Sequence, residues 1–160
     1  MREILFRGKS VNDGEWVFGS LVITTLEPVD DAPIKHYHIE DMTIGCFPNE
    51  FQSGLSETID PNTVGQFTGL TDKNGKKIFE ADIIRTSNGR ISAVSVVKYG
   101  NFRPKMIYDM FGRYIGHFPK QDLHGVYCES SKEQMMLFDS PTCIEVIGNI
   151  HDNPELLEVE

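Results

Sequence analysis

Apolar and polar residues alternate over short segments of this chain, and turn-forming residues separate the segments. In Ile34–Glu40, for example, Ile34, His36 and His38 alternate with Lys35, Tyr37 and Ile39. This period of two is typical of a β-strand. The same pattern predicts strands at Ile4–Lys9, Trp16–Ile23, Ile34–Glu40, Val64–Leu70, Lys76–Phe79, Asp82–Ser87, Arg90–Lys98 and Cys143–Ile150, with further candidates at Met106–Ile115 and Gly125–Cys128.

Asn and Gly residues between these segments predict tight hairpin turns. Asn12-Asp13-Gly14, Asn74-Gly75 and Asn88-Gly89 each contain a residue pair that tolerates the positive φ angles of such turns. A two-residue turn at Asp13-Gly14 would place Val11 opposite Trp16, and Trp16 is therefore predicted to be a substantially buried core residue. Thr24–Pro33, which carries two prolines and three acidic residues, is predicted to be a loop.

Two sequence signals predict short helices. Ser130-Ser131-Lys132-Glu133 has the S-x-x-E pattern of a capping box and predicts a helix that runs to about Phe138. Asn153-Pro154-Glu155 has a capping residue, a proline and an acid in the order expected at a helix start. Since all other segments have strand patterns, the predicted fold is mainly β with a few short helices.

Composition narrows the class of protein. A chain of 160 residues that is 39% hydrophobic and 24% charged is typical of a soluble globular protein large enough to bury a core. It has no apolar run long enough for a membrane span and no signal-peptide pattern at its start. Three cysteines without CxxC spacing exclude a zinc ribbon and favour a reduced, cytoplasmic environment.

Charge is unevenly distributed along the chain, whose net charge is −9. The segment from Arg85 to Lys120 is basic, with Asp109 as its only acid, and aromatic residues are interleaved with its cations. Such a pattern fits either a nucleic-acid or partner surface, or a sheet with an aromatic buried face and a basic solvent face. The candidate binding residues of this segment are Arg85, Arg90, Lys98, Arg103, Lys105 and Arg113.

Candidate catalytic chemistry is sparse. His36-x-His38 places two imidazoles on one face of a strand, but a metal site needs a third ligand, and no recognisable spacing supplies one. Asp72-Lys73-Asn74-Gly75 lacks the remaining ligands of a calcium loop and is better explained as a hairpin turn. Motifs for nucleophilic catalysis and for phosphate binding are absent. The sequence therefore assigns no catalytic residue, no metal ligand and no cofactor.

The C-terminal segment combines a strand with a very short helix. Leu156 and Leu157 must pack somewhere dry, either against their own subunit or against a neighbouring one. The second alternative predicts a homo-oligomer with an interface that includes Ile150, Pro154, Leu156 and Leu157.

Four segments of the chain resemble the YopX family of phage and prophage proteins. They are Phe6-Arg7-Gly8-Lys9, Glu15-Trp16-Val17-Phe18-Gly19, Asp60–Arg85 and Ile144–Leu157. The resemblance implies an N-terminal β subdomain over residues 1–78 and an SH3-like β-barrel with a short C-terminal helix over residues 79–160. One departure is Ala81, where relatives usually carry Gly, so the turn there is expected to be slightly altered.

The resemblance carries no defined biochemical activity. Together with the missing catalytic motifs, it favours a non-enzymatic, oligomeric binding module in the cytoplasm of a bacterial host cell. Its partner would be a protein or a nucleic acid, or its acidic surface would mimic nucleic acid. The alternative is a small metal-dependent hydrolase that uses His36 and His38.

Overall fold

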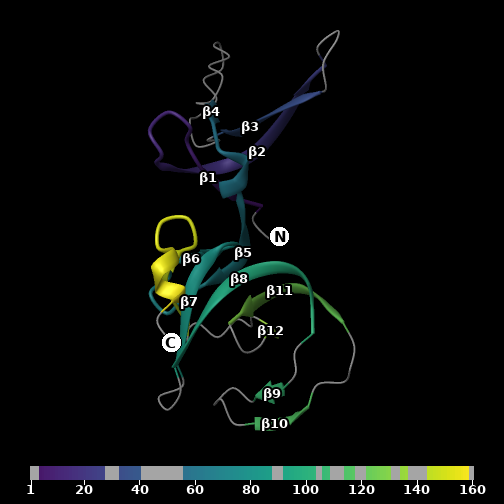
Figure 1. Cartoon of the computed structure of the whole chain (residues 1–160), viewed down its shortest axis with the longest axis vertical. Coiled ribbons are helices and arrows are strands. Elements are labelled where there is room, and N and C mark those ends of the chain that lie inside the picture. The colour runs from purple at the N-terminus through teal and green to yellow at the C-terminus, as the bar shows by residue number, and fades with distance from the viewer. Residues whose placement is uncertain are drawn as a thin grey trace, which may run out of the picture. The chain divides into compact units, whose positions relative to one another are not determined.

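The computed structural model of the chain is composed almost entirely of antiparallel strands (Figure 1). It describes residues 4–27, 33–40, 56–87, 92–103, 106–108, 114–117, 122–130, 134–136 and 144–158. These residues form two compact units, Met1–Phe67 and Thr68–Glu160. The boundary predicted between residues 78 and 79 lies C-terminal to the observed boundary between Phe67 and Thr68. The segment between the two boundaries groups with the second unit, because its Ile78 belongs to that unit's core.

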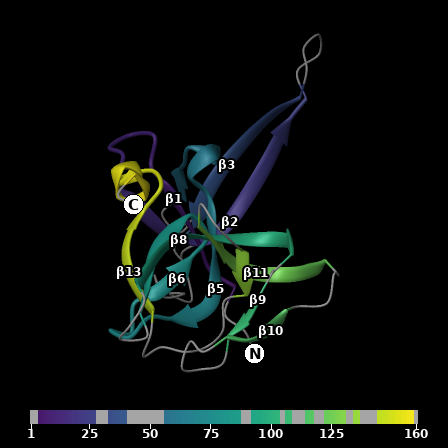
Figure 2. The same cartoon turned by 60° about the horizontal axis from the view of Figure 1, so that its bottom comes forward.

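The first unit is a sheet in which strands follow one another in the order β4-β3-β2-β1 and then the start of β5. Figures 1 and 2 show β2 and β3 extending as a two-stranded ribbon beyond the other strands of this unit. Its strands are β1 (Phe6–Lys9), β2 (Trp16–Leu26), β3 (Ile34–Glu40), β4 (Ser56–Thr58) and β5 (Gly65–Thr71), with the 3-10 helix η1 (Pro61–Thr63) before β5.

Close backbone packing shapes the buried side of this sheet. Gly19 lies against β3 so tightly that a Cβ atom there would be 2.1 Å from the carbonyl oxygen of Glu40. Gly8 similarly leaves room for the side chain of Ile59. Ile39 and Ile59 are buried in the space that these glycines leave. The glycines of β1 and β2 thus leave room for two buried isoleucines.

The second unit contains a five-stranded antiparallel sheet in the order β12-β11-β8-β7-β13. A separate two-stranded sheet pairs β9 with β10. The bounds are β6 (Lys77–Phe79), β7 (Asp82–Ser87), β8 (Ser92–Phe102), β9 (Met106–Tyr108), β10 (Tyr114–His117), β11 (Leu123–Glu129), β12 (Gln134–Met136), β13 (Ile144–Asn149) and the 3-10 helix η3 (Pro154–Leu157).

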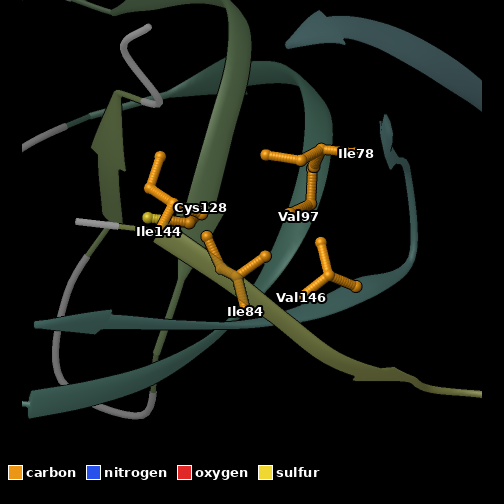
Figure 3. Close-up of a cluster of buried hydrophobic side chains, with 6 residues drawn as sticks. All are labelled: Ile78, Ile84, Val97, Cys128, Ile144 and Val146. Carbon is orange, nitrogen blue, oxygen red and sulfur yellow. The ribbon is translucent and has the colours of Figure 1, made fainter. Parts of the chain in front are cut away.

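The core of the second unit gathers side chains from five strands. Figure 3 shows that these side chains converge, which accounts for their near-complete burial. Burying each isoleucine contributes about 1.5–3 kcal/mol. The cluster consists of Ile78, Ile84, Val97, Cys128, Ile144 and Val146.

The turn between β5 and β6 is fixed by a buried carboxylate. Asp72, whose side chain is 2% exposed, accepts hydrogen bonds from the backbone N–H groups of Asn74 (2.8 Å) and Lys76 (2.9 Å) through Oδ1. Its Oδ2 accepts a third, from the N–H of Val146 in β13 (3.1 Å). The predicted Asn74-Gly75 turn is confirmed, and Gly75 has φ +80°. Asp72 therefore serves as a turn and strand anchor.

The turn between β6 and β7 contains a residue whose backbone conformation favours glycine. Ala81 has φ +67°, the left-handed region that favours glycine. Its N–H donates to the carbonyl oxygen of Val97 (2.9 Å), and its own carbonyl accepts from the N–H of Ile150 (3.0 Å). The buried Asp82 stabilises the same turn by accepting from the N–H of Phe79 (2.7 Å). Tertiary hydrogen bonds hold Ala81 where Gly would be easier.

Two sequence predictions about local structure were wrong. Trp16 pairs with Lys9 and not with Val11, because the first hairpin has a wider loop closed by a hydrogen bond from Ser10 N–H to the Glu15 carbonyl oxygen (2.9 Å). Gln134–Met136 is a strand paired with β11, where the capping box predicted a helix. Tertiary strand pairing overrides that local helix signal.

Two further sequence predictions concern the length of β2 and the closure of the second unit's sheet. β2 continues to Leu26, so the first residues of the predicted Thr24–Pro33 loop are strand. Within the described ranges the five-stranded sheet runs from β12 to β13 without closing on itself. The mainly β fold is thus confirmed, whereas the SH3-like barrel stays a prediction.

Candidate partner-binding surfaces

One face of the first unit's sheet gathers aromatic and basic side chains. Trp16 and Phe18 are two residues apart on β2 and so lie on the same face. Lys9 and Arg7 of β1 stand directly opposite them in the strand register. On the other side of β2, His38 and His36 face Val22 and Thr24 on this same face. We call the surface formed by Arg7, Lys9, Trp16 and Phe18 the Trp16 face. His38 and His36 lie further along the same side of the sheet, opposite residues six and eight positions beyond Trp16.

Trp16 is packed against the two cations of β1. The guanidinium carbon of Arg7 lies 4.6 Å from the centroid of the indole ring, and Nζ of Lys9 lies 5.7 Å from it. Such cation–π contacts attract each cation to the electron-rich ring face. Arg7 is only 6% exposed, whereas Trp16 and Lys9 are half-buried and Phe18 is 48% exposed. The indole is thus partly buried, and it packs against Arg7 and Lys9 of β1 and not against Val11 as the sequence predicted.

Sequence reasoning missed this surface because it assigned Trp16 to the core. The signal was present in the alternation of Arg7 with Lys9 and of Trp16 with Phe18. Only the hairpin register shows that these two alternating pairs face each other.

His36 and His38 lie on one face of β3, as predicted. Their rings are nearly parallel, with an angle of 11° between the planes and 6.2 Å between the centroids. Nδ1 of His38 lies 3.3 Å from Oγ1 of Thr58. In the part of the chain that the structure describes, no three His, Cys, Asp or Glu side chains are grouped so as to hold a metal ion.

The predicted basic segment is only partly described. Arg90, Lys105 and Arg113 lie outside the described residues. Arg85, on β7, is exposed and stands directly opposite Glu145 of β13, and Glu145 in turn pairs with Lys73 (2.9 Å).

The other two described cations of the segment form ion pairs. Nε of Arg103 lies 2.8 Å from the Asp122 carboxylate, and Lys98 pairs with Glu129. The hydrogen bond from Arg103 lowers the pKa of Asp122, and the hydrogen bond from Lys98 lowers the pKa of Glu129. Neighbouring carboxylates therefore offset the positive charge at these positions.

The end of the β8–β11 pair presents another aromatic side chain. Tyr99 is 53% exposed and meets the His124 ring edge-on at 5.0 Å between centroids. Nδ1 of His124 lies 2.8 Å from Oδ1 of Asn101. Tyr99, His124 and Asn101 lie at the same end of β8 as the Arg103–Asp122 ion pair.

The C-terminal segment packs partly on its own unit. A Cβ atom on Gly148 would be 2.9 Å from Cδ1 of Leu156, so Leu156 covers β13 at that point. Ile150 remains 37% and Leu157 40% exposed, and Pro154 is also exposed. The helix start predicted at Asn153-Pro154 is confirmed as η3, although the Asn153 side chain makes no cap hydrogen bond there.

No helix in the described part of the chain is long and apolar enough to cross a membrane.

Comparison with known proteins identifies the family but not an activity. A search of curated proteins finds no match. The crystal structure of protein EF1440 from Enterococcus faecalis is similar over 98% of this chain and 99% of that one, with 24% sequence identity and a TM-score of 0.45. The model of the family described as YopX protein matches residues 5–158. The chain therefore belongs to the YopX family.

Proposed function

We propose that this protein is a non-catalytic binding module of phage or prophage origin that acts in the bacterial cytoplasm. It binds a macromolecular partner through the Trp16 face and works as a homo-oligomer.

The composition of the Trp16 face is the observation that supports the proposal. Binding energy at macromolecular interfaces concentrates in aromatic side chains and arginine. Here Phe18 is exposed beside Trp16, and both belong to a segment that also carries the family resemblance. The surface is a sheet face, whereas sites for small substrates are typically concave. The arrangement suits a large partner better than a small substrate.

The oligomeric part of the proposal rests on the C-terminal segment. Ile150 and Leu157 are apolar side chains that stay partly exposed on a short terminal element. A second copy of the chain can cover them without rearrangement of the core.

Site-specific photo-crosslinking tests the binding function even while the partner is unidentified. A benzophenone amino acid is placed at Phe18 or, as a matched control, at Val11, which is 57% exposed on the hairpin loop of the same unit. Irradiation of cells should give a high-molecular-weight adduct from position 18 and none from position 11. Equal adducts from both positions, or none from position 18, would overturn the proposal.

The alternative function is a metal-dependent hydrolase that uses His36 and His38. The nearly parallel rings on one strand face are the observation in its favour. Elemental analysis of the purified protein tests it. Stoichiometric zinc or manganese that disappears in the His36→Ala/His38→Ala variant would support the hydrolase over the binding module.

A further inference from the structure

We infer that Asn74 is a site of spontaneous deamidation, and that Asp72 controls how fast the reaction proceeds. The residue after Asn74 is Gly75, which has no side chain to shield its backbone nitrogen. Both residues are exposed in the turn between β5 and β6. The turn belongs to the second unit and shares no residue with the Trp16 face.

The reaction needs only these two residues and water. The backbone nitrogen of Gly75 attacks Cγ of Asn74, and a C–N bond forms as the bond to the side-chain amide nitrogen breaks. The proton of the Gly75 nitrogen leaves with that amide group as ammonia, and a succinimide ring remains. Water then adds to one of the two ring carbonyls and opens the ring, which leaves aspartate or isoaspartate at position 74.

Hydrogen bonds to Asp72 engage both reacting groups in the closed turn. The N–H of Gly75 donates to the backbone carbonyl oxygen of Asp72 (3.0 Å). The side chain of Asn74 donates to the Asp72 carboxylate, which also accepts from the Asn74 N–H (2.8 Å). The Gly75 nitrogen must give up its hydrogen bond before it can approach the Asn74 amide carbon, so the turn must open locally first. The buried carboxylate stabilises the closed turn and thereby slows deamidation.

Deamidation weakens the connection between this turn and β13. A carboxylate at position 74 cannot donate to Asp72 as the amide does, and it repels the Asp72 charge. Asp72 accepts from the N–H of Val146 (3.1 Å), and the N–H of Lys73 donates to the carbonyl oxygen of Ile144 (2.9 Å). These two hydrogen bonds join the turn to β13, and both depend on the conformation that Asp72 fixes.

Timed incubation of the full-length protein in mildly alkaline buffer tests the inference. Asn88→Gln is present in every sample, because Asn88-Gly89 is the other Asn-Gly pair of the chain. Peptide mapping by mass spectrometry measures the fraction deamidated at position 74. A synthetic peptide of residues 71–77 is the unprotected reference. We expect the protein to react about 10- to 150-fold more slowly than the peptide, the factor that one hydrogen bond to a charged group provides.

Three variants separate the contributions. Asp72→Ala should raise the rate in the protein toward that of the peptide. Asn74→Gln should leave position 74 unmodified, because glutamine has to close a larger ring. Asp60→Ala removes a turn carboxylate of the first unit and should leave the rate at position 74 unchanged.

A second measurement covers an Asp72→Ala variant that does not fold. In sub-denaturing urea the unsubstituted turn should open more often, so hydrogen exchange of the Gly75 amide and deamidation of Asn74 should accelerate by the same factor. The deamidated protein, separated by anion exchange, should unfold at a lower urea concentration than the unmodified protein. Equal rates in protein and peptide, equal rates in folded Asp72→Ala and wild type, or identical unfolding midpoints would overturn the inference.

Discussion

Ala81 occupies a backbone conformation that is costly for any residue with a Cβ atom. The left-handed region costs an L-residue about 1–2 kcal/mol. The chain tolerates this cost because hydrogen bonds to Val97 and Ile150 fix the turn from both sides. The sequence indicated that Ala81 stands where relatives usually carry Gly. In the structure, this residue has a positive φ.

Replacement of Ala81 by Gly should stabilise the protein. Relief of the strain outweighs the added freedom of the unfolded chain, which costs about 0.4–1 kcal/mol, so we expect a net gain of about 0.5–1 kcal/mol. Urea unfolding measures it. The matched control is Ala93→Gly in β8, where the backbone is regular strand, and there the same change should destabilise by about 0.5–1 kcal/mol. A loss of stability in both variants would contradict the strain argument.

Asp72 is predicted to make stability depend on pH. Burial alone raises the pKa of this carboxyl, but hydrogen bonds from the backbone N–H groups of Val146, Lys76 and Asn74 outweigh it and lower the pKa below the ordinary 3.8. A lowered folded-state pKa means that the stabilisation is complete above the ordinary value. It is lost as the pH falls through the folded-state value.

Asp72→Asn should therefore cost about 2–3 kcal/mol at pH 7, the scale of hydrogen bonds to a charged group. The difference from wild type should shrink as the pH falls below 3.8. Asp60→Asn serves as control, because Asp60 accepts from the backbone N–H of Asn62 in an exposed turn (2.9 Å), and it should cost about 0.5–1 kcal/mol. A constant difference between pH 7 and pH 3 would refute the role of the Asp72 charge.

At the scale of elements, the sequence correctly predicted strands and turns that depend only on residues close together in the chain. Ile34–Glu40 and Asp82–Ser87 are strands with the predicted bounds. The turn at Asp60-Pro61 also follows from local chemistry, since the Asp60 carboxylate accepts a hydrogen bond from the backbone N–H of Asn62, two residues on. The helix expected after Ser130 was wrong because the local cap competes there with pairing to β11. Pairings between distant segments, such as β13 with β7, have no local signal and could not be predicted.

The sequence similarly predicted one part of the candidate surfaces correctly and another part wrongly. The sequence placed His36 and His38 on one face correctly, because strand alternation alone decides it. It misplaced Trp16, because a hairpin loop of different length changes which residue stands opposite. The contacts of Arg7 and Lys9 with the indole ring follow from that register and from nothing local.

Gly19 and Gly8 should differ in their tolerance of a methyl group. In Gly19→Ala the new Cβ would meet the Glu40 backbone at 2.1 Å, and backbone cannot move aside cheaply. We expect a loss of about 3 kcal/mol. In Gly8→Ala the nearest atom, at 2.6 Å, is Cδ1 at the end of the Ile59 side chain, so a smaller loss of about 1 kcal/mol is expected. Thermal unfolding of both variants checks the order, and the reverse order would refute it.

At the scale of the whole molecule, the homo-oligomer is the testable expectation. Leu157→Asp introduces a charge at an exposed apolar position of η3 and should lower the molar mass measured by light scattering. The control Val11→Asp changes an exposed apolar residue elsewhere and should leave the mass unchanged. A chain that ends at Ile150 should dissociate in the same way. A monomeric wild type would mean that the segment only covers its own unit.

Strand β5 crosses the boundary between the units: its first half pairs with β1, and its second half leads to β6. Neither unit therefore retains all of its strands when the other unit unfolds. We therefore expect the unfolding of the two units to be linked, and one intrinsic reporter in each unit can follow it. Trp16 reports the first unit by fluorescence. Cys128, a buried free thiol, reports the second by its reaction with a thiol reagent in a C46S/C143S background. Coincident denaturant midpoints would show one cooperative system, whereas separated midpoints would show that half of β5 suffices for each unit.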